Sequence, residues 1–98
     1  MTNFKQLLES CLLESSLTNY RNHVKDILDN NPNKNIVFYS KNNKLATFNP
    51  DSLNIRNHIT EKVHTAKNLE HAAKILTNFA NDAEGRTLNI KHLSINHE

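Results

Sequence analysis

The first 30 residues carry apolar side chains at helical spacing, but in two different phases. At about 100° per residue, the apolar face over residues 4–12 points roughly half a turn away from the apolar face over residues 17–28. One straight helix would bury one set and expose the other. We therefore predict two helices, at about 3–13 and 16–30, with a break at Glu14-Ser15-Ser16 and a serine capping the second helix. Asn30-Asn31-Pro32 should end that helix, because proline restricts the residue before it.

Residues 35–48 form the clearest motif, in which β-branched and aromatic residues flank Asn42 and Asn43. Asparagine tolerates the left-handed conformation of a tight turn, so this pattern predicts a β-hairpin. With these two asparagines as the turn, one face of the hairpin points to the core and carries Val37, Tyr39, Ala46 and Phe48. Ile36 and Phe38 then lie on the opposite face, where they either form a contact surface for a partner or are covered by a helix.

The second half of the chain also starts as a helix pattern, since Pro50-Asp51-Ser52 is typical of a helix N-terminus. The apolar spacing slips near Asn68. We favour two helices here, at about 52–66 and 68–83, over one long bent helix, with Asn68 capping the second and Gly85 ending it. In the tail, apolar residues alternate at 88 and 90 and again, one residue out of step, at 93 and 95. This pattern predicts a bulged strand that pairs with the hairpin, with a short helix as the alternative.

These elements predict one domain over residues 1–98 in the α+β class. Its order is two N-terminal helices, a β-hairpin, one long or two short helices and a C-terminal strand, with the helices on one face of a small antiparallel sheet. Apolar residues from every element make up the expected core: Leu8, Leu17, Val24, Leu28, Val37, Tyr39, Phe48, Ile59, Val63, Leu69, Leu76 and Phe79.

Composition limits the expected cellular location and source of the protein. The 98 residues are 37% hydrophobic, with a net charge of +2 and 17 asparagines. No apolar run reaches the roughly 18 residues of a membrane span. The start Met1–Gln6 lacks a secretory signal, and a single cysteine allows no internal disulfide, so we expect a cytoplasmic protein. The excess of asparagine and lysine is associated with AT-rich genomes and favours a bacterial or phage origin.

Candidate chemistry is sparse, and we expect neither an enzyme nor a cofactor. The single glycine, Gly85, excludes glycine-rich phosphate loops. No two of the six histidines are three or four residues apart, so their spacing predicts no metal site. Cys11 lies on an apolar face, where a thiol is unreactive. Glu61, Glu70, Asp82 and Glu84 have the spacing of ordinary surface charges.

The remaining interpretation is an interaction module that binds and inhibits or regulates a macromolecule, like an inhibitor, an immunity protein or a phage-borne regulator. The expected partner is another protein or a second copy of the chain. The alternative is a nucleic-acid-binding regulator that uses a basic helix face and the hairpin lysines. The candidate contact residues for the two interpretations together are Ile36, Phe38, Lys41, Lys44, Arg56, Lys67, His71 and Lys74.

Overall fold

The computed structural model describes residues 4–98, with side chains from residue 17 onward. The chain begins with helix α1 (Phe4–Asn30) and continues through four strands: β1 (Ile36–Ser40), β2 (Asn43–Asn49), β3 (Asn54–Asn57) and β4 (Val63–Thr65). Helix α2 follows (Leu69–Glu84), and after it come the 3-10 turns η1 (Gly85–Thr87) and η2 (Ile90–His92) and the strand β5 (Leu93–His97). The fold is α+β, as predicted.

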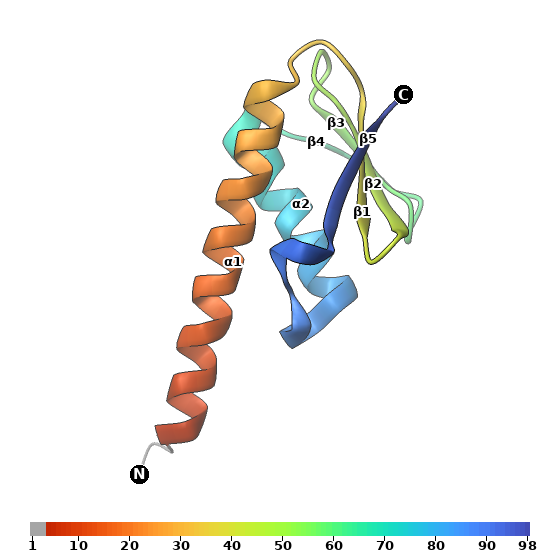
Figure 1. Cartoon of the computed structure of the whole chain (residues 1–98). Coiled ribbons are helices and arrows are strands. Elements are labelled where there is room, and N and C mark those ends of the chain that lie inside the picture. Colours follow the sequence, from red (N-terminus) through yellow and green to blue (C-terminus); the bar gives the residue numbers. More distant parts are fainter. Residues whose placement is uncertain (1–3) are drawn as a thin grey trace.

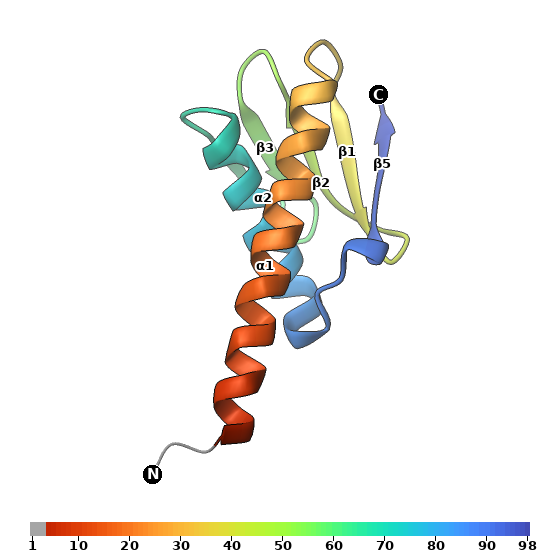
Figure 2. The same ribbon diagram turned by 60° about the vertical axis from the view of Figure 1, so that its left-hand side comes forward.

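The five strands form one antiparallel sheet in the order β4-β3-β2-β1-β5. Figures 1 and 2 show α1 and α2 on the same side of this sheet, and in Figure 2 α1 lies between α2 and β5. The predicted arrangement of helices on one face is therefore confirmed. The main core cluster lies between the sheet and these helices; its larger members are Tyr20, Val24, Leu28, Ile36, Phe38, Leu45, Phe48, Ile55 and Leu76.

Helix α1 runs without interruption from Phe4 to Asn30, where we predicted two helices. The break expected at Glu14–Ser16 is wrong for the backbone, because a change in the phase of apolar side chains does not itself interrupt the helix. No glycine or proline lies between residues 4 and 30 to do so. The apolar face of the first half, including Leu8 and Cys11, lies outside the side chains that the structure describes. The predicted end at Asn30–Pro32 is confirmed.

The hairpin is confirmed, but its turn lies one residue earlier than predicted. Lys41 and Asn42 hold the positive φ angles, at 51° and 69°. The strand register then shifts between Phe38 and Tyr39, so that Phe38 lies opposite Ala46 and Tyr39 opposite Lys44. This bulge changes which residues share a face. Consequently the predicted grouping of Val37 and Tyr39 with Ala46 and Phe48 is wrong: the helix-facing residues are Ile36, Phe38, Ala46 and Phe48.

Residues 52–66 are strands and turns, and the predicted helix over this stretch is wrong. Its β-branched residues and asparagines are poor helix formers, and Leu53 and Glu61 have positive φ angles of 59° and 61° that no helix allows. The apparent helical stripe was coincidental, because Ile59 and Val63 are 62% and 61% exposed. Two members of the predicted core are therefore surface residues.

Helix α2 agrees with its prediction. The Asn68 side chain accepts a hydrogen bond from the backbone N–H of His71 at 2.8 Å, as an N-cap should. Gly85 ends the helix with a φ of 62°. The tail is only partly as predicted. Asn89 caps the turn η2 by accepting from the N–H of Lys91, so the strand begins at 93 and pairs with β1 without the expected bulged start.

Candidate functional site

The structure distributes the predicted contact residues over three locations. Ile36 and Phe38 are 0% and 1% exposed and belong to the core beneath the helices, so they form no contact surface. Of the two alternatives for this face, cover by the helices is the one found. The six remaining candidates are exposed or partly exposed, but they do not form one surface. Lys67, His71 and Lys74 lie at the start of α2, whereas Lys41, Lys44 and Arg56 lie on the hairpin and on β3.

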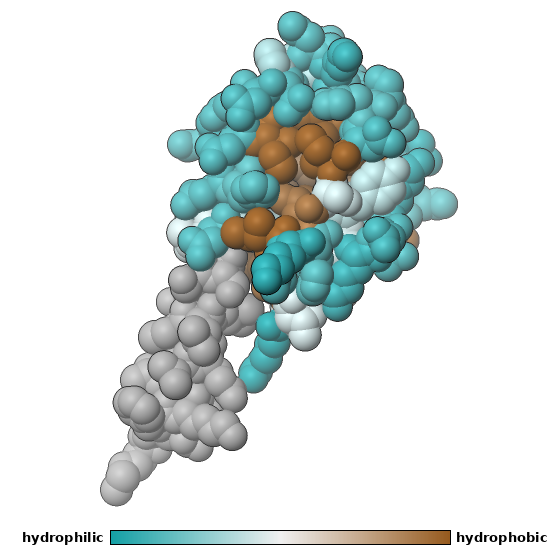
Figure 3. Space-filling view, viewed as in Figure 1, coloured by the Kyte–Doolittle hydropathy of each residue, from teal (hydrophilic) through white to brown (hydrophobic). Residues whose placement is uncertain are grey.

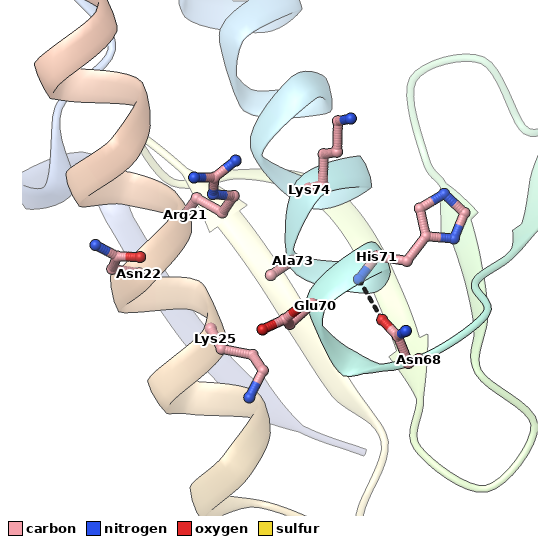
Figure 4. Close-up of a pocket in the computed structure, with 8 residues that line it drawn as sticks. All are labelled: Arg21, Asn22, Lys25, Asn68, Glu70, His71, Ala73 and Lys74. Carbon is pink, nitrogen blue, oxygen red and sulfur yellow. Dashed lines mark hydrogen bonds between the residues drawn. The ribbon is translucent and has the colours of Figure 1, made fainter.

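A groove of about 460 Å³ lies between α1 and the start of α2 (Figure 4). It brings His71 and Lys74 together with Arg21, Asn22 and Lys25, which the sequence analysis did not select. The signal was present in the spacing of Arg21 and Lys25, which are four residues apart and share one face of α1.

Charge in this groove is partly neutralised. Lys25 forms an ion pair with Asp29 at 2.8 Å, and this hydrogen-bonded pair raises the pKa of Lys25. Arg21 and Lys74 form no ion pair with any residue in the described part of the chain. Figure 4 shows these two cations on opposite sides of the groove, with the small side chain of Ala73 between them. The carboxylate of Glu70 also lines the groove, so cationic, amide and acidic groups are mixed around it.

His71 has a defined protonation at one ring nitrogen. The backbone N–H of Lys67 donates to His71 Nδ1 at 3.0 Å, so Nδ1 must keep its lone pair. A neutral ring with this hydrogen bond carries its proton on Nε2. Figure 4 shows this ring on the side of α2 that points away from α1.

A second cationic cluster lies on the sheet face opposite the helices, and it contains Lys44, Arg56 and His58. Nε2 of His58 lies 2.6 Å from the hydroxyl oxygen of Thr47, within hydrogen-bond distance. Desolvation lowers the pKa of His58, and the nearby charges of Lys44 and Arg56 lower it further. The predicted basic residues are thus divided between the two sides of the molecule.

Glu84 is not the ordinary surface charge that its spacing predicts. Its side chain is only 3% exposed, and Oε1 lies 2.5 Å from Nδ1 of His92. The Tyr20 hydroxyl and Glu84 Oε2 are also buried, without hydrogen-bond partners among the described residues. Burial raises the pKa of Tyr20, and the charge of Glu84 raises it further. This cluster joins α1, the end of α2 and the segment that leads into β5.

A carboxylate beside histidine Nδ1 is also the arrangement that orients a general base in hydrolases. Such a base needs a hydroxyl or thiol at its second nitrogen. Within residues 17–98, no hydroxyl is hydrogen-bonded to Nε2 of His92. The contact between Glu84 and His92 holds the segment before β5 against the end of α2.

Three apolar side chains of α1 and β5 remain partly exposed at the border of the core, and we call Ile27, Leu93 and Ile95 the α1–β5 seam. All three pack against the core cluster without being fully buried. Leu93 and Ile95 face the helix side, because they pair with Ser40 and Phe38 of β1. Ile27 lies on the flank of α1 away from Arg21 and Lys25, and hence away from α2. Figure 3, which has the viewpoint of Figure 1, shows an apolar patch along this side of the molecule.

The free edge of β5 borders this seam. The even-numbered residues in and beside β5 direct their backbone N–H and C=O groups toward β1. At the two ends of the strand, Lys41 N–H donates to His92 O at 3.0 Å and Glu98 N–H donates to Asn35 O at 3.2 Å. Residues 93, 95 and 97 therefore turn their N–H and C=O groups away from the sheet. The strand Leu93–His97 contains no lysine, proline, aspartate or glutamate, although such residues commonly protect free edges. The seam and this edge form the candidate binding surface.

Neither a metal-ion cluster nor a membrane-spanning helix is found within residues 4–98. No group of three or more histidine, cysteine, aspartate or glutamate side chains lies close enough to hold a metal ion there. Neither α1 nor α2 combines the length and apolar character that crossing a membrane would require. Comparisons with protein-family models, curated proteins and solved structures found no match to this chain.

Proposed function

We propose that this chain is a non-catalytic interaction domain that binds another protein chain through the α1–β5 seam and the free edge of β5, and that this contact serves to inhibit or regulate a macromolecule. The observation that carries the proposal is that a partly exposed apolar seam and an unpaired strand edge lie side by side. Ile95 belongs to both, because its side chain is in the seam and its backbone faces the free edge.

The mode of binding follows from the chemistry of an unpaired strand. A partner strand added beside β5 gains main-chain hydrogen bonds, and an apolar side chain on that partner is removed from water against the seam. Backbone bonds supply affinity in such complexes, whereas the side-chain contacts supply selectivity. In this proposal the domain acts in the cytoplasm, as an inhibitor, immunity or phage-type regulator would.

The test is quantitative affinity capture from source cells with three baits: the unchanged chain, Ile95→Lys and Val63→Lys. Lysine is a natural protector of free edges, and the matched Val63→Lys change places the same charge on the opposite edge strand, β4. We expect a protein that the unchanged chain and Val63→Lys retain and Ile95→Lys loses by tenfold or more. Its direct binding to the purified chain is then measured by calorimetry.

Circular dichroism must show that both variants are folded. If the Ile95 side chain is needed for folding, Leu93→Lys provides a second position on the same strand. Capture of the same proteins by all three baits, or of no protein by the unchanged chain, contradicts the proposal.

A second candidate, nucleic-acid binding, is favoured by one specific observation: Arg21 and Lys74, which form no ion pair among the described residues, lie on the two sides of a groove that also contains Glu70. Phosphate groups are the natural ligands of such a groove. Fluorescence anisotropy with labelled duplex DNA and single-stranded RNA at about 50 mM salt tests it, since binding should weaken steeply as salt rises.

The matched variants for that test are the double change Arg21→Glu with Lys74→Glu, and a double change on the opposite sheet face, Lys44→Glu with Arg56→Glu. Binding lost only in the first supports the groove. No binding at low salt, or equal loss in both, removes this candidate.

A further inference from the structure

We infer that the occupant of the β5 edge is a second copy of this chain, bound in an antiparallel arrangement around a twofold axis at Ile95. This inference rests on the proposed function, because it names the partner of the same surface. It follows from which backbone groups on the edge are free, from the order of side chains along the strand, and from the difference between the two edges of the sheet.

The free groups are concentrated at one residue. Of the three outward-facing amides, Leu93 N–H is used by Ile90 O, and His97 N–H is used by the Asn96 side chain at 2.9 Å. Ile95 N–H has no such partner among the described residues, and the carbonyl of the same residue also faces outward. When two antiparallel strands meet at one shared residue, that residue exchanges both of its hydrogen bonds with its own copy. Ile95 is therefore the position on β5 best suited to be the centre of a symmetric pair.

The side chains along β5 are compatible with this centre. Pairing around Ile95 places the two Ile95 side chains next to each other on the helix side, where each removes the other from water. His92 of one copy then lies opposite Glu98 of the other, and Lys91 is its immediate neighbour. Opposite charges or neutral groups face each other at each end, so this register contains no like-charge contact.

The opposite edge of the sheet favours a closed dimer over a chain of copies. The strand β4 has three residues, all exposed, and charged residues flank it at Glu61, Lys62 and Lys67. An edge so short and charged is a poor partner for β5, so β5 pairs with β5 of the other copy. That contact is isologous and leaves no further β5 edge free, which limits assembly to two chains. The two five-stranded sheets become one sheet of ten strands (5 + 5) with the helices on the same face.

The approach of a second copy is to an edge strand. Figure 2 shows β5 at the border of the sheet, with α1 over the neighbouring strands. The apolar patch of Figure 3 lies along this side of the molecule, so the contact extends beyond the backbone bonds to the seam.

The experiment combines molar mass with amide exchange on the full chain. Sedimentation equilibrium over a wide range of concentrations should show a monomer–dimer equilibrium for the unchanged chain. Exchange of the Ile95 amide, followed by NMR, should slow at least tenfold from the most dilute to the most concentrated sample. The amides of Val63 and Thr65 on β4 serve as the internal control and should not change.

Two variants locate the contact. Ile95→Pro removes an N–H that is not bonded to β1, and proline is tolerated on a free edge, so the domain should fold as a monomer. The matched Val63→Pro should keep the dimer. Ile95→Lys, which retains all backbone groups, is the second variant if the proline variant does not fold, and it should weaken dimerisation at least tenfold.

The outcomes separate this inference from the proposed function. A dimer that Ile95→Lys weakens and Val63→Pro does not, with slowed exchange at Ile95, supports the inference. A chain that is monomeric at all concentrations, yet captures a different protein through Ile95, overturns the inference and leaves the proposed function standing. A monomer that captures nothing overturns both. A dimer with unchanged exchange at Ile95 also overturns the inference, because its contact lies elsewhere.

Discussion

The two edge strands of the sheet, β4 and β5, occupy equivalent positions but are attached to the fold in different ways. All three residues of β4 are exposed, and Thr65 is linked to its neighbour through a hydrogen bond to Asn54 at 2.8 Å. In contrast, β5 pairs with the interior strand β1 and contributes Leu93 and Ile95 to the surroundings of the core. The segment before β5 is fixed by the contact of His92 with buried Glu84.

This difference teaches that the position of a strand in a sheet does not determine how strongly it is coupled to the core. The β4 edge resembles a well-protected surface, since all three of its residues are exposed and charged residues flank it. At the β5 edge, the partly buried side chains of Leu93 and Ile95 pack against the core and also reach the surface. A partner at β5 would therefore contact side chains that also support the fold, and substitutions on the two edges should have very different consequences.

The largest expected effect is at the anchor of β5. Glu84→Ala removes the partner of His92 and leaves a cavity beside Tyr20, and we expect it to lower the free energy of unfolding by about 2 kcal/mol. Partial exposure of His92 keeps the loss below that of a fully buried ion pair. Urea unfolding monitored by circular dichroism measures it. Glu84→Gln retains an acceptor and should lose less; equal stability of Glu84→Ala and the unchanged chain would show that β5 is not anchored there.

A smaller effect distinguishes the two edges directly. Leu93→Ala shortens a side chain packed against the core and should cost about 1–2 kcal/mol of stability, less than a fully buried leucine would. Val63→Ala changes a side chain that is 61% exposed, and it should stay within about 0.5 kcal/mol of the unchanged chain. Both values come from urea unfolding under identical conditions. Similar losses for the two variants would remove the distinction between the edges.

The smallest effect concerns pH on the polar side of the sheet, where His58 follows β3. Because burial and two nearby cations lower its pKa, the NMR titration midpoint of His58 should lie below 6.5. The unfolded chain then takes up a proton before the folded chain does, so the free energy of unfolding falls as the pH falls from 6.5 through the pKa of the folded state.

Exchanging the nearby cations tests the cause of that shift. In the double variant Lys44→Gln with Arg56→Gln, the His58 midpoint should move upward while remaining below 6.5, because the larger contribution, desolvation, is retained. A midpoint at or above 6.5 in the unchanged chain would contradict the environment described for this face.

Sequence patterns identified the elements whose signals are local. The hairpin followed from the β-branched run beside Asn42, and α2 from its cap at Asn68 and its stop at Gly85. The prediction for residues 52–66 was wrong because only one apolar strand residue, Ile55, faces inward there. Its inward-facing neighbours, such as Asn57 and His64, are polar. The inward His64 ring packs against Phe79 in a tilted arrangement, with 5.4 Å between the ring centroids, and a histidine at this position hides the alternation that indicates a strand.

The candidate site depended on relations between residues far apart in the sequence. A turn placed one residue earlier moved Ile36 and Phe38 from the outside to the core, and no local pattern distinguishes these registers. The seam needs β5 to pair with β1, and the Glu84–His92 contact needs two 3-10 turns between its partners. The alternation of Leu93 with Ile95 and the absence of acidic and lysine residues along that strand are local signals for the seam. No local pattern pairs Glu84 with His92.

The asparagine side chains that cap turns in this fold have a consequence for chemical ageing. Asn49, Asn57, Asn68 and Asn89 each accept backbone N–H groups two or three residues later through Oδ1. Conversion of one of these side chains to aspartate keeps an acceptor oxygen at the same position. No asparagine in the chain precedes the single glycine, Gly85, which is the following residue that hinders deamidation least. Several of the 17 asparagines thus stand where replacement by aspartate leaves the local hydrogen bond in place.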